Sequence, residues 1–473
     1  MSEQAITLET ENTGDGLTRA LAGWIAGLSA AALPPATQAA VRLAVLDTLG
    51  AALYGMDQPW TRAVREWAGR SSPSGNAPRA TVWGEPEARL RPVDAALVNA
   101  VAAHAFELDD FNAKLHPGAV VVPAAMAVAE AVAASGEALQ RAVAAGYEVM
   151  IRTSLALDPS AARLRGWHLT GVCGPLGAAA AAAVLLRLDA ERTAWALGLA
   201  ATQGAGLFAF NADGAMSKRL HPGFAAASGI RAAELAELGV TGPASVLETP
   251  DGGYLRAFSD VVHPECLSDG LGLAWHLEQT YFKPYSCCGS LHSYVDAALD
   301  LRARHGGPPP AGRRVRAGLA RVVEVQCGFD YHPGTELNAQ MNARYCIATA
   351  LLEGAMLPAQ FAGAKLADPQ ILALAERIEL LHDPALDEIY PGNYVGWVEV
   401  ETAAGGFERV YVLDPSGSTA NPEREAGLRA KFRALMAERL PAARTAALEA
   451  AVTAPEARPA AELTALLVSS RVH

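Results

Sequence analysis

The sequence contains little cysteine and little lysine. Its six cysteines are spread over 473 residues with no repeating spacing, which excludes a disulfide framework or a cysteine-rich zinc site and favours a reducing cytoplasm as the location. Only five of the 38 basic residues are lysines, and three of these, Lys114, Lys218 and Lys283, lie in the polar stretches described below. This placement indicates that an ammonium group is needed there.

Long hydrophobic runs are also missing, and residues 1–15 do not predict a signal peptide. The longest charge-free apolar run near the middle of the chain, Gly171 to Leu186, is mostly alanine and is broken by glycine and proline, so no membrane-spanning segment is predicted. Residues 1–15 are acidic and polar, without the basic and apolar regions of a signal peptide. We therefore expect residues 1–15 to form a flexible tail.

Excess positive charge is absent as well. The formal net charge is −12, with acidic residues spread along the chain, which argues against a nucleic acid or an anionic membrane as partner. An anionic ligand must then be held by local positive charge. The 51% of hydrophobic residues supply ample material for the cores of two or three domains.

The hydrophobic pattern from Leu17 to about Ala303 is helical, with apolar residues three and four apart and glycine or proline between blocks. The clearest predicted helices span Pro35–Tyr54, Val93–Glu107, Ala119–Ala134, Gly177–Leu188, Ala190–Gln203 and Ala225–Leu238, and Ala80–Trp83 is the best predicted strand in this part. Alanine-rich helices of this kind pack closely, because alanine favours helix and lets backbones approach.

The pattern changes at the Gly/Pro cluster Arg304–Gly312. Beyond it we predict a strand at Ala320–Cys327, helices at Asn338–Glu353 and Gln370–Leu380, and a hairpin of Val395–Glu401 with Glu408–Leu413. From Asn421 the pattern is helical again, including Leu428–Leu440. The chain is therefore predicted to be mainly α, with a large all-helical domain and a smaller α+β lid domain.

The most unusual stretch is His104–Gly118, which gathers two histidines, three carboxylates and a lysine between apolar segments. Burying so many titratable groups costs free energy unless they are paired, so such clusters are candidate chemistry. His104 and Glu107, three residues apart, share a face if the helix continues to about Asp109, and residues 110–118 then form a loop. Alternatively, Asp109 and Asp110 only cap the turn and His116 only packs before Pro117.

Three further stretches carry polar groups. Gly166–Gly177 contains His168 and is glycine-rich before a helix, which suits an anion at the helix N-terminus. Met216–Gly223 places Lys218, Arg219 and His221 together as a possible carboxylate clamp. Phe282–His292 contains Lys283, Tyr285 and the adjacent Cys287 and Cys288. Each stretch also has a purely structural interpretation: for the first, a histidine that only packs; for the second, a solvated charged face; and for the third, two small buried thiols.

Taken together, these stretches resemble the MmgE/PrpD family, which includes 2-methylcitrate dehydratase, cis-aconitate decarboxylase and iminodisuccinate epimerase. The resemblance covers nearly the whole chain and rests on the segments Leu46–Ala52, Ala80–Gly84, Asn99–Asp110, His116–Pro117, Gly166–His168, Lys218–His221, Thr241–Pro243 and Lys283–Cys288. It implies a homodimer in which residues 16–280 and 415–473 form the all-helical domain and residues 281–414 form the α+β lid.

The resemblance also implies a polar pocket between the domains. Its catalytic residues would be Asp109, His116, His168, Lys218 and Lys283, and its substrate-binding residues His221, Tyr285, Cys288 and Arg219. We expect His168 and Asp109 to transfer protons, and His116 to orient the reacting groups or to donate a proton. In the decarboxylase branch a histidine stands at the position of Cys288, which points away from that activity.

The family's reactions share the need to stabilise a carbanion or enediolate beside a carboxylate, which preorganised cations can do without a metal or an organic cofactor. The leading hypothesis is therefore a cofactor-independent lyase acting on a small di- or tricarboxylate, most simply a dehydratase of the 2-methylcitrate dehydratase type. An epimerase, an isomerase or a decarboxylase of the same family is the alternative. Three more distant alternatives are a metal-dependent hydrolase, a serine hydrolase and a non-catalytic binding protein. The metal ligands of the first would be His104, Glu107, Asp109 and His116.

Overall fold

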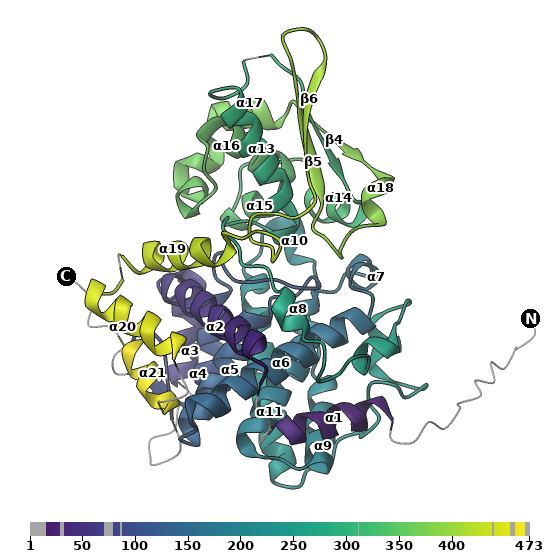
Figure 1. Ribbon diagram of the computed structural model, residues 1–473, viewed down its shortest axis with the longest axis vertical. Coiled ribbons are helices and arrows are strands. Elements are labelled where there is room, and N and C mark those ends of the chain that lie inside the picture. The colour runs from purple at the N-terminus through teal and green to yellow at the C-terminus, as the bar shows by residue number, and fades with distance from the viewer. Residues whose placement is uncertain are drawn as a thin grey trace, which may run out of the picture.

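The computed structural model describes residues 16–28, 33–70, 79–85, 88–310, 312–437, 439–454 and 459–468, so the predicted tail 1–15 lies outside the described residues. Figure 1 shows two parts, a larger helical part below and a smaller part above that carries a sheet. The prediction of a mainly α chain with a smaller α+β part is confirmed.

The helical part is built from most of the chain before residue 281 and from the C-terminal segment. Its helices are α1 (Leu17–Leu28), α2 (Pro35–Gly55), α3 (Pro59–Arg70), α4 (Pro92–Ala103), α5 (Pro117–Ala131), α6 (Gly136–Ala156), α7 (Pro159–Leu164), α8 (Leu169–Leu186), α9 (Ala190–Ala201), α10 (Phe210–Asp213), α11 (Ser217–Glu237), α12 (Tyr254–Phe258), α19 (Arg424–Met436), α20 (Ala442–Thr453) and α21 (Ala460–Leu466). A short antiparallel pair, β1 (Ala80–Thr81) and β2 (Arg89–Leu90), confirms the strand predicted at Ala80.

The upper part contains α13 (His292–Arg304), α14 (Arg321–Cys327), α15 (Glu336–Gln340), α16 (Ala343–Glu353), α17 (Pro369–Ala375) and α18 (Pro384–Asp387). Its sheet has the order β4-β3-β5-β6, from β3 (Val315–Leu319), β4 (Ile378–His382), β5 (Gly396–Glu401) and β6 (Phe407–Val412). β3 pairs parallel with β4, and the other neighbours are antiparallel. The predicted hairpin is confirmed as β5 and β6.

Three predictions in this part were wrong. The helix predicted at Asn338–Glu353 is two helices, α15 and α16, interrupted at residues 341–342. Residues 321–327 form helix α14, and the strand is the preceding β3, which the arginines at 313, 314 and 316 obscured in the pattern. The predicted helix Gln370–Leu380 stops at Ala375, because residues 378–382 pair with β3. Sheet pairing between distant segments overrides local helix propensity here.

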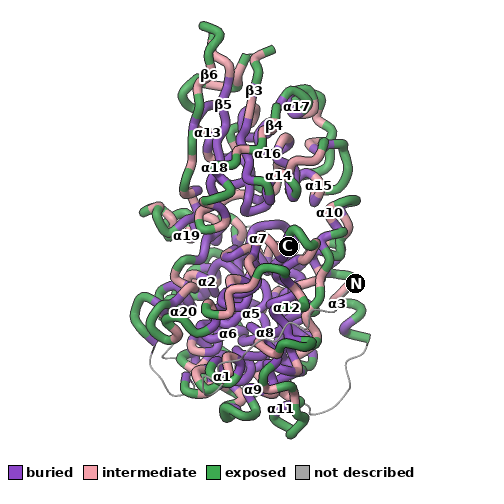
Figure 2. Tube along the Cα trace, turned by 90° about the vertical axis from the view of Figure 1, so that its right-hand side faces the viewer, coloured by how far each residue is buried: buried purple, intermediate pink, exposed green. Residues whose placement is uncertain are grey.

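Two buried hydrophobic clusters correspond to the two parts. The larger takes its residues from Leu21 to Phe282 and again from Leu428 to Leu467. The smaller consists mainly of residues between Tyr281 and Val410, with a few from α2, α3 and α4, from the segment 105–111, and from positions 208 and 210. Figure 2 shows buried chain through both parts. The domain limits 281 and 414 remain our proposal.

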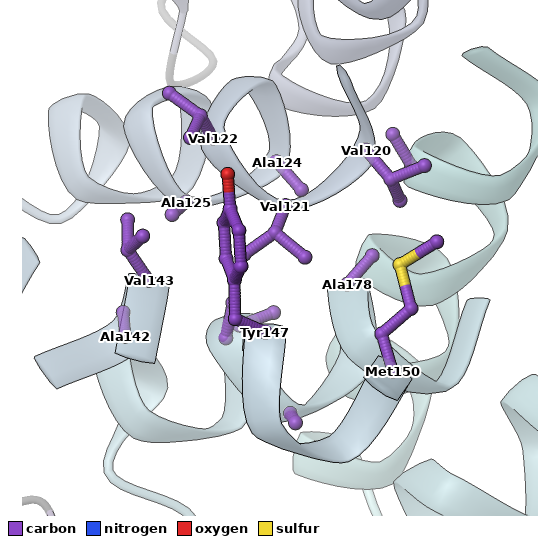
Figure 3. Packing of buried hydrophobic residues seen from close by; sticks show 14 of the residues in the cluster. Val120, Val121, Val122, Ala124, Ala125, Ala142, Val143, Tyr147, Met150 and Ala178 are labelled. Atoms are coloured by element: carbon purple, nitrogen blue, oxygen red, sulfur yellow. The ribbon is translucent and has the colours of Figure 1, made fainter. Parts of the chain in front are cut away.

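Helix α8 is the central element of the helical core, and it packs against α11, α6 and α5. By length and composition α8 could cross a membrane, but 94% of it is buried inside the molecule; α2 and α3 pass the same test only as a pair bent by 89°. Core packing therefore accounts for the apolar composition of α8. Figure 3 shows part of this core, where Tyr147 of α6 extends among Val121, Val122 and Ala125 of α5.

The glycines of the stretch 166–177 serve this packing. The helix begins at Leu169, so Gly171, Gly174 and Gly177 lie inside it, which corrects the prediction of a glycine-rich loop before the helix. A Cβ at Gly174 would lie 2.7 Å from the Cβ of Ala225 on α11, and one at Gly177 would lie 2.8 Å from the carbonyl oxygen of Gly146 on α6. These glycines allow close helix contact and do not bind an anion through a loop.

Candidate active site

The segment between α4 and α5 forms the floor of the site. Helix α4 ends at Ala103, so the predicted continuation to Glu107 was wrong, and His104 and Glu107 do not share a helix face. Glu107 has φ 55°, a left-handed conformation that an α-helix cannot accommodate. Residue Phe111 then pairs with Tyr281 through two backbone hydrogen bonds of 3.0 and 2.9 Å. Pro117 starts α5.

Glu107 is the centre of a buried ionic cluster. Its Oε1 accepts from Lys218 and, at 2.6 Å, from Arg219, and its Oε2 accepts from Lys283 at 2.8 Å. Burial opposes the charge of Glu107, but Lys218, Lys283 and Arg219 outweigh it and hold the pKa of this carboxyl well below its usual value. Glu107 therefore remains ionised and places two lysines at fixed positions.

The two lysines respond differently to this environment. Burial lowers the pKa of Lys218 in spite of Glu107, and Arg219 and Lys283 lower it further. Burial also acts on Lys283, but the attraction of Glu107 and Asp109 outweighs it and raises the pKa of Lys283. Lys283 is thus the more firmly charged cation, while Lys218 is the easier of the two to deprotonate.

Asp109 is a fully buried carboxylate between two histidines. Its Oδ2 lies 2.7 Å from His104 Nδ1 and 3.2 Å from His116 Nδ1. Burial would raise its pKa, but His104, His116 and Lys283 keep the pKa of Asp109 well below its usual value. Because His116 Nδ1 is also 2.9 Å from the carbonyl oxygen of Asp110, Nδ1 carries the proton and Nε2 is the free nitrogen of His116.

His104 connects Asp109 to the lysines. Its Nδ1 faces Asp109 and its Nε2 accepts from Lys218 Nζ at 3.1 Å. Burial lowers the pKa of His104 to about 3, so the ring is neutral. His168 precedes α8, and its Nδ1 lies 2.8 Å from Nδ1 of His221. Burial, together with His221 and Lys218, holds the pKa of His168 well below its usual value.

A cavity opens beside this cluster, and residues from both parts of the molecule line it. Its lining includes Glu107, Lys114, His116, Arg163, His168, Phe208 and Lys218 from the helical part, and Cys288, Gly289, Ser290, Gln326, Met341 and Tyr394 from the upper part. Figure 1 places α7, α10 and α19 where the two parts meet. The cavity is thus lined by two histidines, of which His168 is held neutral, and by the cations Lys114, Arg163 and Lys218.

The predicted residues divide into three groups. His116, His168, Lys218 and Cys288 line the cavity. The second group, Asp109, Lys283, Arg219 and His221, lies behind the lining and contacts it. Tyr285 is not brought into the site, because its hydroxyl group donates to Asp296.

The Cys288 thiol is unusual among the described cysteines. Gln326 Nε2 donates to its Sγ at 3.1 Å. A hydrogen bond from Cys327, assisted by the charge of Lys283, outweighs burial and lowers the pKa of Cys288 to about 5. Cys287 is buried in the same upper hydrophobic cluster as Cys288 but does not line the cavity, as expected for a packing residue.

Sequence reasoning missed several contributors. It gave His104 and Glu107 a role only in the metal hypothesis, and it did not assign Lys114, Arg163, Gln326 or Tyr394 to the site. The scarcity of lysine was a usable signal for Lys114. Nothing in the sequence distinguishes Arg163 from the other arginines.

Three histidines could also hold a metal ion. One nitrogen from each of His104, His116 and His168 lies within 4.8 Å of the others. Glu107, which the metal hypothesis included, is bound by three cations. Both ring nitrogens of His104 already have partners, Nδ1 in Asp109 and Nε2 in Lys218, so a metal ion at this position would have to displace one of them.

The cavity of this mainly helical chain is lined by lysines, histidines and a carboxylate, which are the residue types of an acid–base site. Comparison with known proteins identifies it further. Residues 19–266 match the MmgE/PrpD N-terminal domain and residues 285–455 match the MmgE/PrpD C-terminal domain. The chain belongs to the MmgE/PrpD family, as the sequence motifs predicted.

Similar curated proteins are cis-aconitate decarboxylases. One from Aspergillus terreus (strain NIH 2624 / FGSC A1156) is 29% identical over 443 residues, covering 88% of this chain and 87% of that protein. The Mus musculus enzyme is 29% identical over 432 residues, covering 88% and 86%. The Homo sapiens enzyme is 31% identical over 352 residues, covering 72% and 71%. The lyase class predicted for this chain is also the class of these relatives.

Proposed function

We propose that this chain is a lyase that decarboxylates a small unsaturated tricarboxylate of the cis-aconitate type without a metal or an organic cofactor. The observation that carries the proposal is the Lys218–Glu107–Lys283 cluster beside His116 and His168. The relatives favour decarboxylation over the dehydration that the resemblance alone led us to expect.

The reaction needs an electron sink and a proton donor. When the C–COO⁻ bond breaks, carbon dioxide leaves and the electron pair stays on carbon, where the neighbouring carboxylate spreads it as an enediolate. Fixed cations stabilise this developing charge better than water does, because they need no reorganisation. Lys218 lines the cavity and supplies such a charge, and Lys283 supports it from behind through Glu107.

A proton must then be added to carbon. His168 is held neutral, so the donor is the Lys218 ammonium, which lines the cavity and whose pKa burial lowers. We had expected Asp109 to handle protons directly. Its position behind His104 and His116 favours an orienting role, in which the carboxylate fixes the tautomer of both rings.

Dehydration of a 2-hydroxy tricarboxylate is the second candidate, and Cys288 favours it. A cysteine, Cys288, lines the cavity where the decarboxylase branch carries histidine. Epimerisation would instead need two bases on opposite faces of the substrate.

Two assays separate these reactions. Incubation with cis-aconitate should release one carbon dioxide per turnover, and the Lys218→Met variant should lose about 10²- to 10³-fold in kcat if Lys218 stabilises the transition state. Incubation with 2-methylcitrate or citrate, followed by ultraviolet absorbance, reports an unsaturated product if the chain is a dehydratase. If neither cis-aconitate nor the hydroxy acids are turned over, the proposed lyase activity is contradicted.

The remaining alternatives have their own tests. Stoichiometric, tightly held metal in the purified protein would support the metal-dependent hydrolase and overturn the metal-free mechanism. A binding protein would lose affinity on substitution of Lys218 and His168 without ever showing turnover. A homodimer in the cytoplasm, which interacts with neither nucleic acid nor membrane, remains our proposal for the assembly and its location.

A further inference from the structure

Two cations in the cavity lining have no acidic partner among the described residues. Arg163 lies on α7 and Lys114 lies in the segment before α5, and both face the cavity. Within the part of the chain that the structure describes, no carboxylate is within ion-pair distance of either side chain. Lys218, Arg219 and Lys283, in contrast, all share Glu107.

Arg163 is a buried, incompletely satisfied guanidinium group. The residue is 7% exposed, its Cζ lies 3.3 Å from the centre of the Phe208 ring, and its Nε has no hydrogen-bond partner among the described residues. Burial lowers the pKa of Arg163 to about 10. Because an unpaired buried cation is costly, an anionic ligand at this position would recover free energy that the folded chain alone does not.

Lys114 is placed by a strained turn. Asn112 and Leu115 exchange backbone hydrogen bonds of 3.1 and 2.7 Å, and the two residues between them have φ of 46° for Ala113 and 60° for Lys114. Glycine or asparagine normally occupies such a turn, and other residues there cost roughly 1–2 kcal/mol each. Strain retained beside a cavity is a sign of function.

Neighbouring groups hold this turn in place. Ser154 Oγ donates to the Ala113 carbonyl oxygen at 2.7 Å, and the Lys114 backbone N–H donates to the Tyr394 hydroxyl group at 3.1 Å. The Lys114 ammonium donates to the Tyr390 hydroxyl group at 2.9 Å. Burial lowers the pKa of Lys114 to about 8, which the nearby Cys288 and Cys327 thiols counteract. The groups around the ammonium are therefore phenols and thiols.

We propose that Arg163 and Lys114 form a second carboxylate-binding subsite, which holds a carboxylate of the substrate remote from the reacting carbon. This inference rests on the proposed function, because it divides one cavity into a reacting end at Lys218 and a recognition end at Arg163 and Lys114. The recognition end selects substrates with an additional carboxylate over shorter dicarboxylates.

Calorimetric titration with propane-1,2,3-tricarboxylate and with succinate tests the subsite independently of turnover, since the enzyme chemistry proposed above acts on neither. The wild-type chain should bind the tricarboxylate more tightly than succinate. Arg163→Met and Lys114→Met should each weaken tricarboxylate binding about 10- to 100-fold, the range for a hydrogen bond to a charged group. Both should leave succinate binding within about twofold.

Arg165→Met is the matched control, because Arg165 is exposed and pairs with Asp260. It should bind both ligands like the wild type. Methionine preserves the apolar contact of Arg163 with Phe208. Because no ion pair is lost and a costly buried charge is removed, Arg163→Met should unfold at a temperature no lower than that of the wild type. Arg163→Lys, which retains the charge, should recover part of the affinity.

Either of two results would overturn the subsite: no tricarboxylate binding by the wild-type chain, or unchanged binding by Arg163→Met and Lys114→Met. Loss of succinate and tricarboxylate binding in equal measure would also contradict it, because the pair would then act at the reacting end. If the tricarboxylate binds through Arg163 but no substrate is turned over, the subsite stands and the proposed lyase activity fails.

Discussion

At the scale of single residues, the buried carboxyl groups behave in opposite ways although they are close in sequence. Glu107 and Asp109 stay ionised because cations and histidines surround them. Asp110 faces the other way and contacts Tyr147, whose hydroxyl group donates to its Oδ2 at 2.6 Å. Burial and the nearby Asp47 raise the pKa of Asp110 to about 8. Of the two adjacent aspartates, Asp109 is therefore a charged group of the site, and Asp110 is a neutral group that supports it.

Asp110 predicts a pH dependence of stability. In the unfolded chain its carboxyl group ionises near pH 3.8, whereas the folded chain holds the proton up to about pH 8. The folded state thus binds more protons in this window, and the free energy of unfolding falls as pH rises from about 4 to about 8. Asp110→Asn cannot ionise, so its slope should be shallower by up to about 1.4 kcal/mol per pH unit.

Chemical denaturation of both proteins at several pH values measures these slopes. Identical slopes between pH 4 and pH 8 would show that Asp110 is ionised in the folded chain. In the wild type the Gly118 N–H donates to Asp110 Oδ1 at 2.9 Å. The amide oxygen that Asp110→Asn introduces can accept the same hydrogen bond, so the substitution preserves that contact.

At the scale of elements, the distance between α8 and α11 determines where the site residues meet. His168 precedes α8, and Lys218 lies in the first turn of α11. Gly229 lies where the two helices touch, and a Cβ there would be 2.4 Å from the Cβ of Ala178 and 2.5 Å from the carbonyl oxygen of Pro175. A larger residue must push the helices apart.

Gly229→Ala should therefore destabilise the chain by about 1–3 kcal/mol, the usual cost of overpacking. Gly23→Ala is the control, because Gly23 is exposed in α1 and a Cβ added there would meet no described atom within 4 Å. That change should stabilise the chain by roughly 0.5–1 kcal/mol, since alanine favours helix. Equal unfolding midpoints for the two variants would contradict the close contact of α8 and α11.

At the scale of the whole molecule, the C-terminal segment closes the site from outside. Lys431 of α19 forms an ion pair of 2.6 Å with Asp47 of α2. Its ammonium also donates to the carbonyl oxygens of Leu108 at 2.7 Å and Lys283 at 2.8 Å. Figure 1 shows α19 between the two parts of the molecule. One lysine thus joins the N-terminal helices, the Glu107–Asp109 segment and the backbone of Lys283.

Lys431→Met should reduce both stability and turnover. It leaves the buried Asp47 carboxylate without its partner, a loss of about 3–5 kcal/mol, and it releases the backbone on which Lys283 is held. Lys365→Met is the control, since Lys365 is partly exposed beside Glu353 and such pairs contribute about 1 kcal/mol or less. Thermal unfolding and kcat measure the two effects, and similar losses in both variants would refute a joining role for Lys431.

The sequence by itself determined the helical class, the β5–β6 hairpin, the family and the polar stretches of the site. These features depend on composition, on periodicity and on short motifs, which act within a few residues. His116, His168, Lys218 and Lys283 were predictable for the same reason, because each lies in a stretch that stands out from an alanine-rich background.

Only the tertiary structure decided which groups pair and which stay unpaired. Glu107 became the centre of the cluster because Lys218 and Lys283, more than a hundred residues away, reach it. Tyr285 lies outside the site, where its hydroxyl group donates to Asp296. Arg163 lines the cavity, and its Nε has no hydrogen-bond partner among the described residues. The charge and proton affinity of a buried side chain depend on such distant partners and on the water excluded around them, and no local pattern in the chain records either.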